Sequence, residues 1–188
     1  DGTNTLICLV KSPGHIKDKE LFDDRVVDVL RSLKGMGLLW KSDIQDKGLL
    51  RRLCTEDYFA GRRFQFLVHW DPDALANPSA NGWLPLHLAA SKHSIPVLRL
   101  VFEAGIRYFP REKGINFLFR KNDFGRTPFQ YACDEHGIEE VMKVVENALA
   151  DCSEEPLNTT EALLSAAIDD NIGLDGVNFL LQIGRAHV

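Results

Sequence analysis

The residue types that support catalysis or metal binding are present, but their spacing matches no known catalytic or metal site. Cys133 and His136 stand three positions apart, as two zinc ligands can, yet no second pair completes a tetrahedral set. Residues 35–37 (GMG) form a lone Gly-x-Gly motif, which predicts a helix end and a turn. The sequence lacks Gly-x-Ser-x-Gly, Walker A and His-Glu-x-x-His motifs. We therefore predict no catalytic residue, no metal, no cofactor and no enzyme activity.

One basic and aromatic stretch, residues 106–121, has the composition of a surface that binds single-stranded nucleic acid. Phe117 and Phe119 alternate with other residues, as they would in an elongated finger packed on its neighbour. We interpret the stretch as such a structural finger. A loop that contacts a protein and a nucleic-acid site are the alternatives, and the net charge of −5 disfavours nucleic acid.

Charge is unevenly distributed along the chain. Residues 49–126 have a net charge of +5, whereas residues 134–175 hold twelve acidic residues and a single base, Lys143. This separation could steer a charged partner, or it could mark solvated faces of opposite sign. No apolar run reaches the roughly 18–20 residues of a membrane span, so we expect no membrane segment. Nothing in the sequence indicates a homo-oligomer.

The four cysteines are widely scattered and include no closely spaced pair: Cys8, Cys54, Cys133 and Cys152. Scattered cysteines are typical of reduced thiols. They predict an intracellular protein, cytoplasmic or nuclear.

Two matching strings, residues 82–90 (GWLPLHLAA) and 125–133 (GRTPFQYAC), dominate the organisation of the chain. In the second string, Thr127 has the place of a helix N-cap and Pro128 that of the first helical residue. Gln130 follows Thr127 at capping-box spacing, and Gly125 supplies a tight turn before the cap. Amphipathic runs from residues 95 and 138 follow the two strings. Each string therefore predicts a short helix and then a second helix.

These strings resemble the ankyrin repeat, in which a hairpin finger precedes Thr-Pro-Leu-His-x-Ala-Ala and a second helix. The first string departs at Leu84, where the family usually has Thr. The second has Phe129 for Leu and Gln130 for His. The resemblance implies that His87 caps its helix and links neighbouring fingers. The residues that carry the motif are Gly82, Pro85, His87, Ala89, Gly125, Thr127, Pro128 and Gln130.

Weaker copies of the same frame extend in both directions. They predict one all-α domain over residues 1–182, a solenoid of stacked helix-turn-helix pairs with short β-hairpin fingers. Its units lie near residues 1–40, 41–77, 78–120, 121–156 and 157–182. We expect the chain to be a fragment of a longer repeat protein. Residues 183–188 (IGRAHV) also match the translation of a sequencing adapter, an artefact; a helix end at Gly184 is the alternative.

The resemblance implies a protein-protein interaction module that binds through finger tips and first helices. The family's binding positions correspond here to Trp83, Ser91, Lys92, Phe124, Arg126, Asp134, Glu135 and Asp169. Trp83 is the first choice, because Trp and Arg dominate interface energetics, although its ring could instead pack on the neighbouring finger. A regulatory or scaffolding arm of a larger enzyme or channel is one alternative function. An enzyme that depends on His87 is another.

Overall fold

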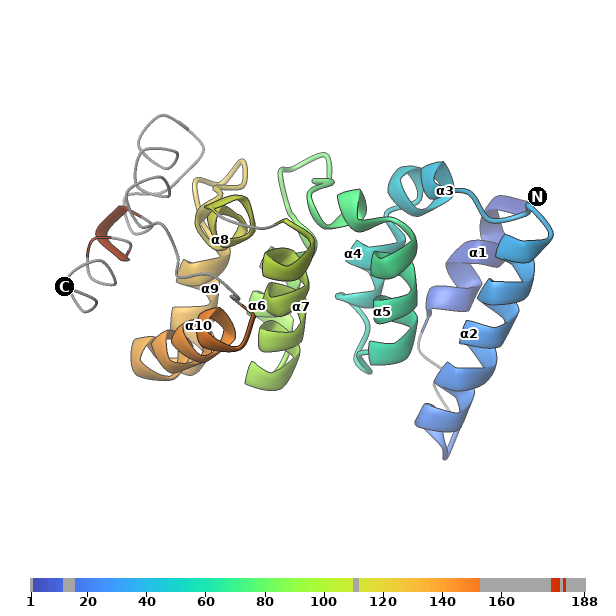
Figure 1. Ribbon diagram of the computed structural model, residues 1–188, viewed down its shortest axis with the longest axis horizontal. Helices are drawn as coiled ribbons and strands as arrows, with labels where there is room; N and C mark the ends of the chain where they lie inside the picture. Colours follow the sequence, from blue (N-terminus) through green and yellow to red (C-terminus); the bar gives the residue numbers. More distant parts are fainter. Residues whose placement is uncertain (1, 12–15, 110–111, 153–176, 180, 182–188) are drawn as a thin grey trace. The chain divides into compact units, whose positions relative to one another are not determined.

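The computed structural model describes residues 2–11, 16–109, 112–152, 177–179 and 181 (Figure 1). The described residues are predominantly helical and contain no strand, which confirms the all-α prediction. The chain divides into two compact units, the N-terminal unit Asp1–Asn77 and the C-terminal unit Pro78–Val188. This boundary coincides with the limit that the sequence places between its second and third repeats.

Among its described residues, the N-terminal unit contains two helix pairs and two short additional helices. The first pair is α1 (Gly2–Val10) and α2 (Lys19–Gly35), and the second is α4 (Leu49–Leu53) and α5 (Gly61–Trp70). α1 packs on α4 and α2 packs on α5, so equivalent members of the two pairs are in contact. The additional helices are α3 (Lys41–Asp46), which the sequence did not predict, and the 3-10 helix η1 (Pro72–Leu75).

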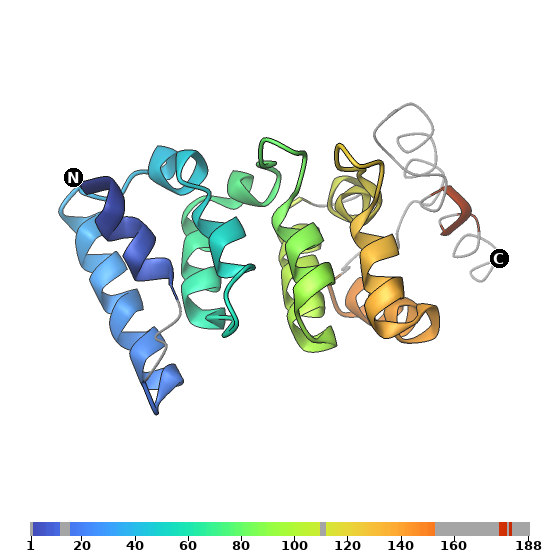
Figure 2. The same ribbon diagram turned by 180° about the vertical axis from the view of Figure 1, so that it is seen from behind.

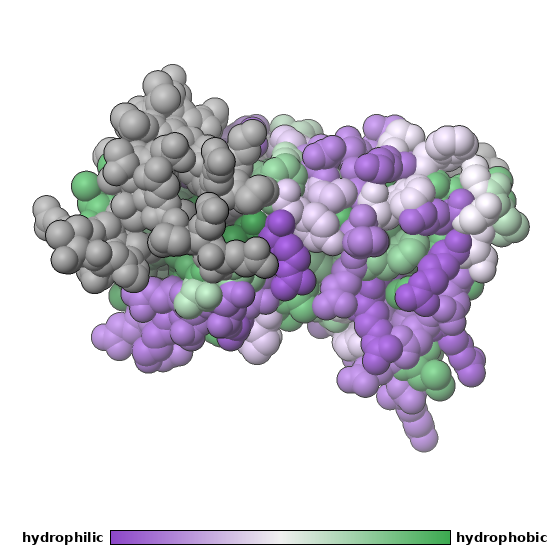
Figure 3. Space-filling model, viewed as in Figure 1, coloured by the Kyte–Doolittle hydropathy of each residue, from purple (hydrophilic) through white to green (hydrophobic). Residues whose placement is uncertain are grey.

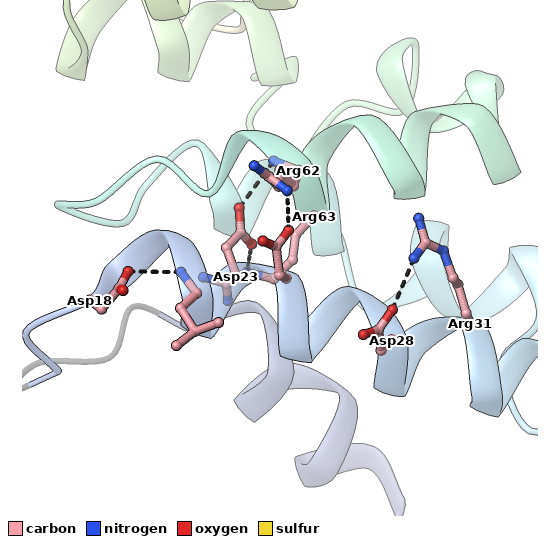
Figure 4. A network of polar contacts seen from close by, with 8 residues as sticks. Asp18, Asp23, Asp28, Arg31, Arg62 and Arg63 are labelled. Atoms are coloured by element: carbon pink, nitrogen blue, oxygen red, sulfur yellow. Dashed lines mark hydrogen bonds and ion pairs between the residues drawn. The ribbon is translucent and has the colours of Figure 1, made fainter.

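A buried ion pair joins the helices of the N-terminal unit (Figure 4). Arg63 of α5 donates from Nε to Oδ1 of Asp23 in α2 at 2.6 Å, and neither side chain is more than 2% exposed. Arg63 Nη1 also donates to the carbonyl oxygens of Leu9 and Lys11. Asp23 accepts a further hydrogen bond from the Arg62 backbone N–H at 3.0 Å. One ion pair therefore ties α2, α5 and the end of α1 together.

Asp23 lies in the apolar stripe of its helix. Asp23, Val26 and Val27 of α2 are buried at the same spacing as the all-apolar set Phe64, Leu67 and Val68 of α5. A buried carboxylate is costly to desolvate unless a counter-charge and hydrogen bonds compensate it. Arg63 supplies both.

We expect Asp23→Ala to lower the free energy of unfolding of the N-terminal unit by about 3–5 kcal/mol, because Arg63 would stay buried without its counter-charge. Asp28→Ala is the matched control. It breaks the Asp28–Arg31 pair of the same helix, whose side chains are 72% and 65% exposed. That change should cost no more than about 1 kcal/mol. Urea unfolding followed by circular dichroism measures both, and equal losses would contradict the assignment.

The described part of the C-terminal unit contains two further helix pairs. α6 (Pro85–Lys92) is followed by α7 (Ile95–Tyr108), and α9 (Pro128–His136) by α10 (Ile138–Cys152). α6 packs on α9 and α7 packs on α10. Figure 2 shows α6 and α9 side by side. α10 buries Val141, Val144, Val145 and Ala148, while hydrophilic residues cover its outer side in Figure 3.

The finger predicted within residues 106–121 is wrong, because this segment contains a helix, α8 (Glu112–Phe119). Ile115, Leu118 and Phe119 form its buried stripe, and their helical spacing prevails over the alternation of Phe117 and Phe119. The backbones of α7 and α8 approach closely at Gly114. A Cβ atom there would lie 2.6 Å from Ile106 Cα. The segment therefore adds a helix to the core of the unit.

The predicted fifth repeat falls largely outside the described residues, Asp169 included. Residues 177–179 are helical, and the ring of Phe179 lies 5.3 Å from that of Phe119 and 6.1 Å from that of Phe129. Within the described ranges, no helix has the length and apolar character needed to span a membrane.

Candidate functional site

Two tight turns with the same hydrogen bonds precede α6 and α9, the first helices of the two pairs in the C-terminal unit. Turn 1 is residues 79–83 and turn 2 is residues 122–126. In each, the first residue donates its N–H to the carbonyl of the fifth, at 2.8 Å in turn 1 and 2.9 Å in turn 2. The fourth residue, Gly82 or Gly125, donates to the carbonyl of the first at 3.0 and 2.9 Å. Both glycines have a positive φ, +73° and +72°.

The side chain at the first position of each turn accepts two backbone hydrogen bonds, although the residue type differs between the turns. Ser79 Oγ accepts hydrogen bonds from the N–H groups of Asn81 and Trp83 at 3.3 and 3.1 Å. Asn122 Oδ1 accepts from those of Phe124 and Arg126 at 3.0 and 3.1 Å. The two turns are therefore one structure built twice, although their sequences share little beyond the glycine.

The turns are also in direct contact with each other. The N–H of Asp123 in turn 2 donates to the carbonyl of Asn81 in turn 1 at 3.2 Å. Gly82 lies against the same segment, because a Cβ atom on it would be 2.7 Å from Asp123 Oδ1 and 3.0 Å from Asp123 N. Only a residue without a side chain permits this approach.

His87 connects the start of α6 to turn 2. The ring is fully buried, and Nδ1 accepts the N–H of Leu84 at 3.1 Å. Nδ1 therefore carries no proton, and Nε2 donates to the carbonyl oxygen of Arg126 at 3.2 Å. Because both ring nitrogens are bonded to backbone groups, His87 lacks the open position that a general base needs.

The capping arrangement explains why His87 takes this position. At α9, Thr127 Oγ1 accepts the N–H of Gln130 at 3.2 Å, and Gln130 Oε1 accepts the N–H of Thr127 at 3.1 Å. Leu84, the N-cap of α6, has no side-chain acceptor. His87 therefore supplies half of the capping box, as Gln130 does for α9, and adds the bond to turn 2.

The planar groups of Trp83, Tyr131 and Arg126 lie in a row beside His87, and we call them the aromatic column. The Trp83 ring lies 5.8 Å from the His87 ring and 4.9 Å from that of Tyr131. The guanidinium of Arg126 lies 4.5 Å from the Tyr131 ring centre and forms an ion pair with Asp134. That ion pair raises the pKa of Arg126. Trp83 is half-buried, and its ring packs on Tyr131 of α9.

The structure brings some of the predicted binding residues together and separates others. Trp83, Arg126 and Asp134 meet around Tyr131, which the sequence analysis did not select. Phe124, 66% exposed, lies in turn 2. Together these five residues make up what we call the turn surface. Of the other predicted residues, Ser91, Lys92 and Glu135 lie towards the C-terminal ends of α6 and α9, with Lys92 and Glu135 exposed and Ser91 half-buried, and Asp169 lies outside the described residues.

One member of the Cys133–His136 pair is engaged by a backbone group. His136 Nε2 is hydrogen-bonded to the carbonyl oxygen of His93 at 3.0 Å. Over the described ranges, no group of three or more His, Cys, Asp or Glu side chains is placed to hold a metal ion.

No protein-family model, curated protein or solved structure matches the chain.

We expect the C-terminal unit to lose stability as the pH falls from about 6.5 towards 4. Burial lowers the pKa of His87 from 6.5 to about 4, against the opposing effect of its hydrogen bond to Arg126. The unfolded chain therefore binds a proton in this window that the folded chain does not, which costs up to roughly 3 kcal/mol. Urea unfolding at a series of pH values measures the slope. His87→Gln keeps a capping side chain, and if this control shows the same slope, another group titrates.

The two glycines offer a test of the contact between the turns. Gly82→Ala and Gly125→Ala place alanine at nearly the same positive φ, which costs about 1–2 kcal/mol at each site. At Gly82 alone the new methyl also collides with Asp123, whereas nothing lies within 4 Å at Gly125. We therefore expect Gly82→Ala to lower the unfolding midpoint further. Equal midpoints for the two variants would show that the turns do not press on each other.

Proposed function

We propose that the chain is a diverged ankyrin-like repeat protein and that its C-terminal unit binds another protein through the turn surface. The observation that carries the proposal is the equivalence of the two turns, bond for bond, at a constant offset in sequence. Ser79 corresponds to Asn122, Gly82 to Gly125, and His87 to Gln130. A unit that repeats its turn, cap and helix pair is typical of solenoids that present turns and first helices to a partner.

The composition of the turn surface supports protein binding. Trp, Tyr and Arg are the residue types most enriched among interface hot spots, and all three occur in its aromatic column. The Arg126 guanidinium is held by the Tyr131 ring and the Asp134 carboxylate. A side chain that is already ordered loses less conformational entropy on binding. Phe124 adds an exposed ring beside this ordered set.

The hydrogen bonding at the site favours binding over catalysis. Both nitrogens of His87 are bonded to the backbone, and Asp134 is paired with Arg126. The groups that could move a proton are therefore committed to holding the turns and the column in place. We place the protein inside the cell as part of the same proposal, since no disulfide joins any two of its cysteines in the described part of the chain.

The test is affinity capture of partners from native cell extract with the full chain as bait. A Trp83→Ala/Arg126→Ala bait should lose a partner that the wild type retains. In a direct titration with that partner, Trp83→Ala alone should weaken binding by about 2 kcal/mol, or roughly 30-fold. The matched control is Trp40→Ala/Arg31→Ala, which removes the same residue types from an exposed region of the N-terminal unit.

Both double variants must first show the circular dichroism spectrum of the wild type, because Trp83 also packs on Tyr131. Phe124→Ala provides a second variant that removes little buried contact. If the partner binds the Trp83→Ala/Arg126→Ala and Phe124→Ala proteins as well as the wild type, the turn surface is not its binding site.

A further inference from the structure

The tip of turn 1 contains the only Asn-Gly sequence in the chain, Asn81-Gly82. An asparagine can lose its side-chain amide when the backbone nitrogen of the next residue attacks the side-chain carbonyl carbon. A side chain on that next residue obstructs the attack, and glycine has none. We propose that Asn81 is a site of spontaneous deamidation and that the reaction breaks the link between the two turns.

Asn81 differs in its surroundings from four other asparagines of the described segments, Asn77, Asn116, Asn122 and Asn147. It is exposed, and none of those segments supplies a hydrogen bond to its side-chain amide. Asn122 is 5% exposed, and its side chain bonds to two backbone N–H groups and to the Tyr131 hydroxyl. Asn77 precedes Pro78, which has no N–H to cyclise. Asn116 and Asn147 lie within α8 and α10, where helical geometry holds the following amide away from the side chain.

The reaction has two steps and uses only water. The Gly82 nitrogen forms a bond to Cγ of Asn81, the Cγ–N bond of the side-chain amide breaks, and ammonia leaves with the proton from Gly82. Water then opens the resulting succinimide ring at either carbonyl. One opening gives aspartate and the other gives isoaspartate, in which the main chain runs through the former side chain and is longer by one methylene group.

The ring removes one of the bonds that shape turn 1. The Gly82 nitrogen no longer carries the hydrogen that it donates to the carbonyl of Ser79 at 3.0 Å. The same bond must open before the nitrogen can attack, so the reaction rate follows the opening of the turn. Base accelerates the reaction, because the attacking amide nitrogen must lose its proton.

The product also alters the contact between the turns. The Asn81 carbonyl accepts the N–H of Asp123. In isoaspartate the main chain runs through the former side chain instead, and this carbonyl becomes a free carboxylate outside the main chain. Both products add a carboxylate to turn 1 next to Gly82, and Gly82 lies against Asp123: a Cβ on Gly82 would be 2.7 Å from Asp123 Oδ1. The added negative charge therefore repels that of Asp123. Any effect on partner binding rests on the proposed function. The deamidation of Asn81 and the loss of the hydrogen bond between the turns do not.

The experiment is to incubate the full chain in mildly alkaline buffer at physiological temperature and to map deamidation by peptide mass spectrometry. We expect Asn81 to react at least about tenfold faster than Asn77, Asn116, Asn122 or Asn147, a difference of about 1.4 kcal/mol in activation free energy. Asn81→Gln is the control, because its longer side chain would have to close a larger and less favourable ring. Loss of the Asn81 amide no faster than that of the others would overturn the site.

The second readout is hydrogen exchange at the Asp123 amide. Its exchange should become at least about tenfold faster in the deamidated protein and in Asn81→Asp, since an amide that loses its partner loses protection. The Asn122 amide, which donates within turn 2, provides the internal reference. Unchanged exchange at Asp123 in the fully deamidated protein would overturn the coupling between the turns. Neither readout requires a partner, so either can fail while the proposed binding function stands.

Discussion

The geometry of the candidate binding surface depends on the two hydrogen bonds of the His87 ring. One nitrogen caps α6 and the other holds the Arg126 carbonyl, so a single buried side chain fixes a helix start and the neighbouring turn together. The bond to Arg126 also anchors the residue whose guanidinium lies on Tyr131. Protonation of Nδ1 would break the cap. The neutral form of His87 is therefore a structural requirement of the surface, and burial of the ring favours that form.

The N-terminal unit joins its helix pairs by a different polar group. There Arg63 and Asp23 are buried as a charged pair, and backbone carbonyls and an N–H satisfy most of their remaining polar atoms. In both units a buried polar group reaches across from one helix pair to the next. Such a group is favourable only when its partners are in place, so it penalises any other register of the two pairs. The charged pair carries the larger desolvation cost and the imidazole the smaller one.

The features that could be predicted from sequence are those decided by neighbours along the chain. Thr127, Pro128 and Gln130 act within one helical turn, and the capping box they predict is present. α8 was missed because Phe119 fits both the alternation with Phe117 and the helical spacing with Ile115, and the choice depends on packing against α7. Gly114 gave no local signal, since its role comes from a backbone distant in sequence. Half-burial of Trp83 likewise depends on Tyr131, which belongs to the next helix pair.

The inserted helix α8 shows that the proposed repeats are held in register by the contacts between their turns. The first helices begin 43 residues apart at Pro85 and Pro128, whereas the period of an ankyrin repeat is about 33. α8 accommodates the extra length by packing on α7 and placing Phe119 against Phe129. After this inserted helix, turn 2 still lies where the Asp123 N–H donates to the Asn81 carbonyl and the Arg126 carbonyl accepts from His87. The pairing of the turns is therefore fixed by hydrogen bonds and not by repeat length, so the turn surface tolerates an insertion behind it but not the loss of the hydrogen bonds that pair the turns.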